Sequence, residues 1–140
     1  MNDGHIRTAA SGLQRAGGCC EYCRVEKTDE TAPFHVDHII PLKHHGADDL
    51  DNLCFSWYQC NAYKGPNMAA ADPVTGKAAF LFDPRKQTWD DHFQINTDAT
   101  LSGKTPAGRV TIDVLKMNAE SRVEYRLFAM RVDEYPCQKD

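Results

Sequence analysis

The stretch FHVDHIIPLKHHGADDLDNLCFSWYQCNAYKG, residues 34–65, decides the fold of this 140-residue chain. Residues 34–38 predict a short strand, and Pro41 ends it because proline cannot donate a ladder hydrogen bond. A polar loop of ten residues follows. A second strand is expected at residues 53–55, and a helix capped by Ser56 is expected from about Trp57 to Lys64. The stretch therefore predicts a strand–loop–strand–helix unit.

The polar residues of this unit have a spacing that carries chemistry. Asp37 and His38 end the first strand, Asn52 precedes the second strand, and Asn61 and Lys64 lie on the helix. A carboxylate beside an imidazole, with amide side chains spaced to fold back on them, suits a metal-assisted hydrolase.

This pattern resembles the HNH endonuclease family, the ββα-metal nucleases. The resemblance rests on the ordered set Asp37-His38, Asn52 and Asn61-x-x-Lys64. Further segments resemble one bacterial branch of the family, namely Cys20-x-x-Cys23, residues 65–67, 72–76 and 81–85, and more weakly 105–126. The resemblance implies an enzyme that hydrolyses phosphodiester bonds of DNA, by nicking or by cleavage.

The resemblance also implies a role for each residue. His38 is the expected general base, Asp37 and Asn61 hold one Mg²⁺ or Mn²⁺ ion, and Asn52 ties down the loop that supports His38. Lys64 could meet a substrate phosphate. The alternatives are a histidine satisfied at a strand end, a surface Asp37 paired with a lysine, an ordinary turn asparagine and a solvated lysine.

One difficulty concerns the strand itself. Successive side chains of a strand point to opposite faces, so Asp37 and His38 can serve one site only if the strand breaks there. Pro41 makes such a break reasonable.

The cysteines depart from the family pattern. Six cysteines are present, and in a reducing cytosol such a set favours metal ligands over disulfides. Cys20, Cys23 and Cys60 are candidate ligands of a structural Zn²⁺, but the fourth ligand is missing because position 57 is tryptophan. Three readings stay open: zinc on three cysteines with an unidentified fourth ligand, an empty site in which Trp57 packs, or a disulfide between two cysteines.

The whole chain is expected to be a single α+β domain over residues 1–140. It comprises an HNH core at about 19–68 and a strand-and-helix extension at about 69–140. A helix from about His5 to Gly17 is expected before the core. Thr105-Pro106 predicts a helix start, and a last helix should face Val123, Leu127 and Met130 inward.

Charge and composition bound the function. Hydrophobic content of 41% and charged content of 26% indicate an ordinary soluble domain without a membrane span, and we expect a cytoplasmic protein. The net charge of −4 predicts weak, salt-sensitive DNA binding, or a partner that supplies the grip, and a homodimer is left open. The alternative function is a non-catalytic nucleic-acid-binding module on a degenerate HNH fold.

Overall fold

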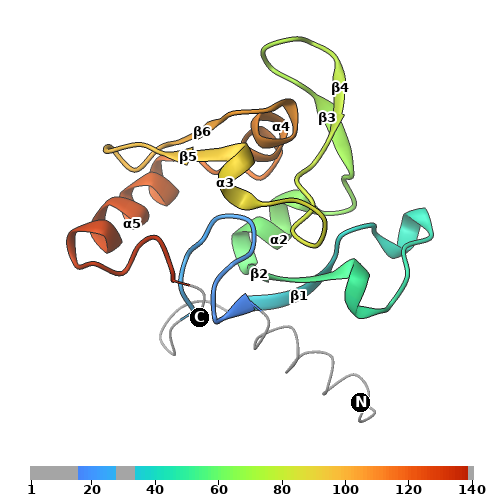
Figure 1. Cartoon of the computed structure of the whole chain (residues 1–140), viewed down its shortest axis with the longest axis horizontal. Helices are drawn as coiled ribbons and strands as arrows, with labels where there is room; N and C mark the ends of the chain where they lie inside the picture. The colour runs from blue at the N-terminus through green and yellow to red at the C-terminus, as the bar shows by residue number, and fades with distance from the viewer. Residues whose placement is uncertain (1–15, 28–33, 139–140) are drawn as a thin grey trace.

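The computed structural model describes residues 16–27 and 34–138, so residues 5–15 of the expected first helix lie outside the described part. Figure 1 shows three small two-stranded antiparallel sheets with helices around them, which is a mixed α and β architecture. The strands are β1 (Phe34–His38), β2 (Leu53–Trp57), β3 (Ala69–Ala71), β4 (Ala78–Phe80), β5 (Phe93–Ile95) and β6 (Leu101–Gly103). The α-helices are α2 (Tyr58–Lys64), α3 (Trp89–His92), α4 (Pro106–Val114) and α5 (Glu120–Arg131), and the 3₁₀ turns are η1 (Leu42–His44) and η2 (Leu50–Asn52).

The first sheet and α2 are the unit that the sequence predicts. β1 pairs with β2 so that Asp37 faces Cys54 and His38 faces Leu53. β2 is longer than expected because all five of its residues are buried, and α2 follows it directly. The predicted cap is wrong: Ser56 lies inside β2, and Trp57 precedes the helix without a capping hydrogen bond.

The extension packs on this unit through aromatic side chains. Trp89 Nε1 donates a 2.7 Å hydrogen bond to the Tyr22 carbonyl in the cysteine turn. The Trp89 ring stacks on Phe93 at a centroid distance of 4.8 Å, and Phe82 meets Phe93 edge-on at 5.3 Å. One cluster of buried residues therefore includes both the cysteine turn and the extension. The extension thereby adds apolar burial to the unit.

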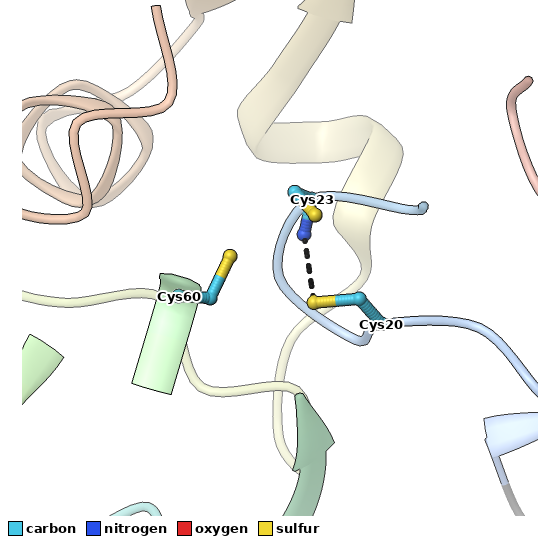
Figure 2. Close-up of side chains that lie close together, drawn as sticks. All are labelled: Cys20, Cys23 and Cys60. Carbon is cyan, nitrogen blue, oxygen red and sulfur yellow. Dashed lines mark hydrogen bonds between the residues drawn. The ribbon is translucent and has the colours of Figure 1, made fainter. Parts of the chain in front are cut away.

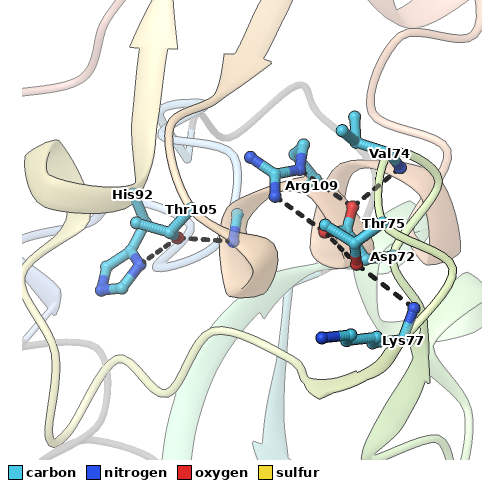
Figure 3. Close-up of polar contacts among 8 residues, drawn as sticks. Asp72, Val74, Thr75, Lys77, His92, Thr105 and Arg109 are labelled. Atoms are coloured by element: carbon cyan, nitrogen blue, oxygen red, sulfur yellow. Dashed lines mark hydrogen bonds and ion pairs between the residues drawn. The ribbon is translucent and has the colours of Figure 1, made fainter.

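Polar contacts fix the β3–β4 turn to α4 (Figure 3). Asp72 accepts two hydrogen bonds from Arg109, at 2.9 Å from Nε and 2.7 Å from Nη2. These bonds, together with those from Val74 and Thr75, hold the pKa of Asp72 well below its ordinary value. The predicted helix start at Thr105-Pro106 is confirmed, because Thr105 Oγ1 accepts from Gly108 N at 3.1 Å.

The last helix turns a different face inward from the one expected. The buried residues of α5 are Arg122, Arg126 and Ala129, whereas Val123, Leu127 and Met130 are only half-buried. Two arginines in a core face require polar partners. Arg126 Nε donates to the Ala99 carbonyl at 2.9 Å, and Arg122 reaches the cysteines.

The C-terminal tail returns to the cysteine turn, as Figure 1 shows. Cys19 and Cys137 form a disulfide. Tyr135 Oη donates a 2.7 Å hydrogen bond to the Cys23 carbonyl, and Arg24 Nη2 donates to the Cys137 carbonyl at 3.0 Å. The interpretation in which two cysteines form a disulfide therefore holds for Cys19 and Cys137. The candidate zinc ligands Cys20, Cys23 and Cys60 are free thiols.

Candidate active site

A buried ion pair lies where β1 ends. Lys64 Nζ is 3.2 Å from Asp37 Oδ2 and donates a 3.0 Å hydrogen bond to the His38 carbonyl. The side chains are 2% exposed for Lys64 and 13% exposed for Asp37. The alternative that Lys64 is a solvated side chain is therefore wrong. The alternative that Asp37 pairs with a lysine is correct, but the pair lies away from the surface. Contact of Lys64 with a phosphate stays a prediction, and it requires the ammonium group to turn away from Asp37.

The surroundings of the Asp37 carboxylate shift its pKa. Burial raises its pKa above the ordinary value, while the charge of Lys64 opposes that shift. Despite the ion pair, Oδ2 is buried without a well-aligned hydrogen bond from the described residues. An under-satisfied carboxylate oxygen is a donor that suits a hard divalent ion, so this residue fits Mg²⁺ or Mn²⁺.

The His38 side chain turns to the loop between η1 and η2. Its Nε2 atom lies 2.9 Å from Asp48 Oδ1. The His38 side chain is 26% exposed, so water can reach the ring. Asp37 faces α2 while His38 faces the loop, so strand alternation continues through His38, and the break that would bring both side chains to one site does not fall between them. The two residues are neighbours in the chain, and the charge of a protonated His38 lowers the pKa of Asp37.

Asn52 closes the loop that follows β1. Its Oδ1 accepts from Ile40 N at 2.8 Å, and its Nδ2 donates to the carbonyls of Ile40 at 2.9 Å and Ala47 at 2.7 Å. The loop is so tight that a Cβ on Gly46 would lie 1.7 Å from the Ile40 carbonyl oxygen. These bonds fit the loop-holding role that the resemblance implies. Support of catalysis by Asn52 stays a prediction.

Asn61 lies on α2, three residues before Lys64. Residues three apart share a helix face, and Lys64 shows that this face is turned to the end of β1. Asn61 is half-buried. Its role as second metal ligand stays a prediction.

The cysteine cluster comprises Cys20, Cys23 and Cys60, and Figure 2 shows the three thiols facing one another. Their sulfur atoms all lie within 4.8 Å of one another, and all three residues are fully buried. Cys23 N donates to Cys20 Sγ at 3.4 Å. Cysteine sulfurs are ligands that structural Zn²⁺ prefers, so the cluster supplies three of the four ligands that such a site needs.

Arg122 approaches the cysteine cluster from α5. Its Nη2 donates a 2.8 Å hydrogen bond to Cys60 Sγ, and Nη1 donates to the Leu115 carbonyl. Its guanidinium carbon lies 5.7 Å from the centroid of Trp57, the residue that replaces the expected cysteine. A guanidinium has no free electron pair and cannot be a zinc ligand. Among the described residues, no fourth cysteine, histidine or carboxylate joins the three sulfurs.

The three thiols of the cluster differ in the direction in which their pKa is shifted. Burial raises the pKa of Cys20 to about 12 and also raises that of Cys60. Burial opposes ionisation of Cys23 too, but hydrogen bonds from the other two thiols and the charge of Arg122 outweigh it and hold its pKa well below the ordinary value. The charge of Arg122 therefore favours ionisation of Cys23 over ionisation of the other two thiols.

Two residues of these centres escaped the sequence analysis. Asp48 is one of several acids in a polar loop, and only the fold-back imposed by Asn52 brings it to His38. Arg122 lies on a helix whose apolar residues suggest another inward face. Arg126 follows four residues later on the same helix face, and this spacing was the available signal of a charged buried face.

Comparison with known proteins identifies the class. Residues 20–67 match the family model of the HNH endonucleases, which spans the cysteine turn, β1, β2 and α2. The resemblance recognised in the sequence is thereby confirmed for this segment, which is similar to the HNH endonucleases. The match indicates nuclease-type chemistry.

A curated relative extends the similarity beyond this segment. The chain is 26% identical over 120 residues to the Septu protein PtuB of Bacillus thuringiensis. The aligned part is 81% of this chain and 42% of the relative, so the chain spans about two fifths of that protein's length. No solved structure matches the chain. In the described residues, no helix has the length and apolar character needed to cross a bilayer.

Proposed function

We propose that this protein is a metal-dependent DNA endonuclease that hydrolyses phosphodiester bonds. The observation that carries the proposal is the half-buried Asp37 carboxylate, paired with Lys64 and next to a partly exposed imidazole, inside a segment that matches the HNH family. The net charge of −4 opposes binding to the DNA backbone, so we expect weak, salt-sensitive binding or a partner that supplies the grip.

His38 would take the proton of the attacking water, because a neutral imidazole accepts protons near pH 7. Asp37 and Asn61 would hold one Mg²⁺ or Mn²⁺ ion. When bound, the ion would neutralise charge on the phosphate and stabilise the departing 3′ oxygen, which leaves a 5′-phosphate end. Asn52 would keep the loop closed, so that the position of His38 is maintained.

Plasmid nicking tests this assignment. We expect nicking in Mg²⁺ or Mn²⁺ that EDTA abolishes, and a loss of about a hundredfold or more in His38→Ala. The matched control is His35→Ala, which removes an exposed histidine from the same strand. Undiminished cleavage by His38→Ala, in a variant with unchanged unfolding, would reject His38 as the base.

The second candidate is a non-catalytic nucleic-acid-binding module. It is favoured by the Lys64–Asp37 ion pair, which neutralises the carboxylate without a metal. Measurable DNA binding by the wild type, with no cleavage in any divalent ion, would select this function.

A further inference from the structure

We propose that Asp48 is a positioning residue for His38, which sets the tautomer of the ring and leaves Nδ1 as the proton-accepting nitrogen. The consequence for catalysis rests on the proposed endonuclease function. The contact itself does not, since it joins two side chains of this chain at 2.9 Å.

The chemistry of the contact decides the tautomer. An ionised carboxylate only accepts hydrogen bonds, so the His38 Nε2 atom that faces Asp48 Oδ1 must carry the proton. In a neutral imidazole one nitrogen carries the proton and the other has the free electron pair. His38 Nδ1 is therefore the atom that can take a proton from water.

The loop delivers Asp48 to this place. Asn52 Nδ2 binds the carbonyl of Ala47, the residue directly before Asp48, and Gly46 N donates to the Pro41 carbonyl at 3.0 Å. The backbone around Asp48 is thus fixed to the end of β1 by bonds that do not involve the Asp48 side chain. That side chain is 81% exposed, so its removal should cost the fold little.

A neighbouring acid provides a matched control. Asp49 is exposed and adjacent in the loop, and its carbonyl accepts the Asn52 amide at 3.0 Å through the backbone alone. Asp49→Ala therefore changes loop charge by the same amount as Asp48→Ala but keeps the contact with His38. Any effect seen with Asp48→Ala alone belongs to that contact.

Long-range proton–nitrogen NMR of ¹⁵N-histidine protein, in EDTA and without DNA, reads the tautomer directly. His38 is assigned by the signals lost in His38→Gln. We expect the Nε2–H form of His38 in the wild type and in Asp49→Ala, and a mixture of tautomers in Asp48→Ala. An Nδ1–H wild type, or an unchanged ring in Asp48→Ala, would overturn the proposal.

Cleavage kinetics test the catalytic consequence. We expect kcat to fall about tenfold in Asp48→Ala with KM for DNA unchanged, and Asp48→Asn to recover part of the loss because its amide oxygen can accept from Nε2. Tautomers that respond as expected in a wild type that does not cleave DNA would support the positioning and reject the endonuclease. A normal kcat in Asp48→Ala would refute the catalytic consequence.

Discussion

Each of two polar centres of this molecule contains a buried cationic side chain, but the surroundings of the two centres differ. At the cysteine cluster a fully buried guanidinium faces thiols, and at the end of β1 a buried ammonium faces the carboxylate of Asp37. The cluster lies within the buried core, whereas the β1 site opens to water through His38. At both centres an internal cation contacts side chains that are candidate metal ligands. The difference in enclosure predicts that the first centre governs stability and the second governs chemistry.

Arg122→Met should have the largest effect. It removes the cation that balances the cysteine cluster and leaves the Leu115 carbonyl without its partner, so we expect a loss of about 3 kcal/mol in the free energy of unfolding. Urea unfolding measures it, with Arg131→Met, at an exposed position of the same helix, as control. Equal stability of the two variants would contradict the distinction between the centres.

Cys60→Ala should cost more than Cys54→Ala. Both remove a fully buried free thiol from the first unit, but only Cys60 accepts from Arg122, whereas the Cys54 thiol donates to Tyr22 Oη at 3.4 Å. We expect a difference of about 2 kcal/mol, because the buried guanidinium loses a hydrogen-bond acceptor. The same denaturant curves measure it, and equal costs would show that the volume of the thiol, and not its hydrogen bond to Arg122, accounts for the stabilisation.

Lys64→Met tests the open centre. Without the ammonium group the Asp37 carboxylate is uncompensated, so the variant should be less stable in EDTA and should bind Mn²⁺ more tightly by on the order of 1–2 kcal/mol. The shift of the thermal midpoint on adding Mn²⁺ reports this gain. Lys43→Met, at an exposed lysine of η1, should show the wild-type shift. If Lys64→Met responded no more strongly than this control, the lysine would not occupy the place of the ion.

The pH dependence of Mn²⁺ binding should show the smallest effect. Only ionised Asp37 can hold the ion, and burial raises its pKa, so affinity should begin to fall at a higher pH than for an ordinary aspartate with a pKa of about 3.9. Below that raised pKa, each further pH unit should weaken binding by about tenfold. Calorimetric titrations from about pH 7.5 down to about pH 3.5, which is below the ordinary pKa, measure the decline. Constant affinity down to that pH would exclude Asp37 as a ligand.

The fold of residues 34–65 was largely predictable because its signals are local. Pro41 ends the first strand, and the order of strand, loop, strand and helix follows the sequence. The cap at Ser56 was wrong because burial of the whole of β2 outweighs the local preference of serine for a cap.

The candidate site was predictable as a set of residues but not as a set of contacts. Asp37 and Lys64 were both named, yet their mutual ion pair depends on the angle between α2 and β1, which no spacing reveals. Arg122 is separated by 62 residues from the cysteine it contacts. Long-range pairings of this kind are set by packing of the whole core. The sequence of a helix with mixed polar and apolar residues does not indicate which of its faces packs against that core.

The bond between Cys19 and Cys137 joins residues that are 118 positions apart in the sequence. Topologically, the described chain is a ring when this bond is closed and a line when it is open. The ring excludes most extended conformations of the unfolded protein. The thermal midpoint of unfolding should therefore be higher when the disulfide is formed than when it is reduced. The disulfide lies next to the cysteine cluster, because Cys19 directly precedes Cys20, and reduction should therefore loosen this part of the scaffold before it disturbs His38.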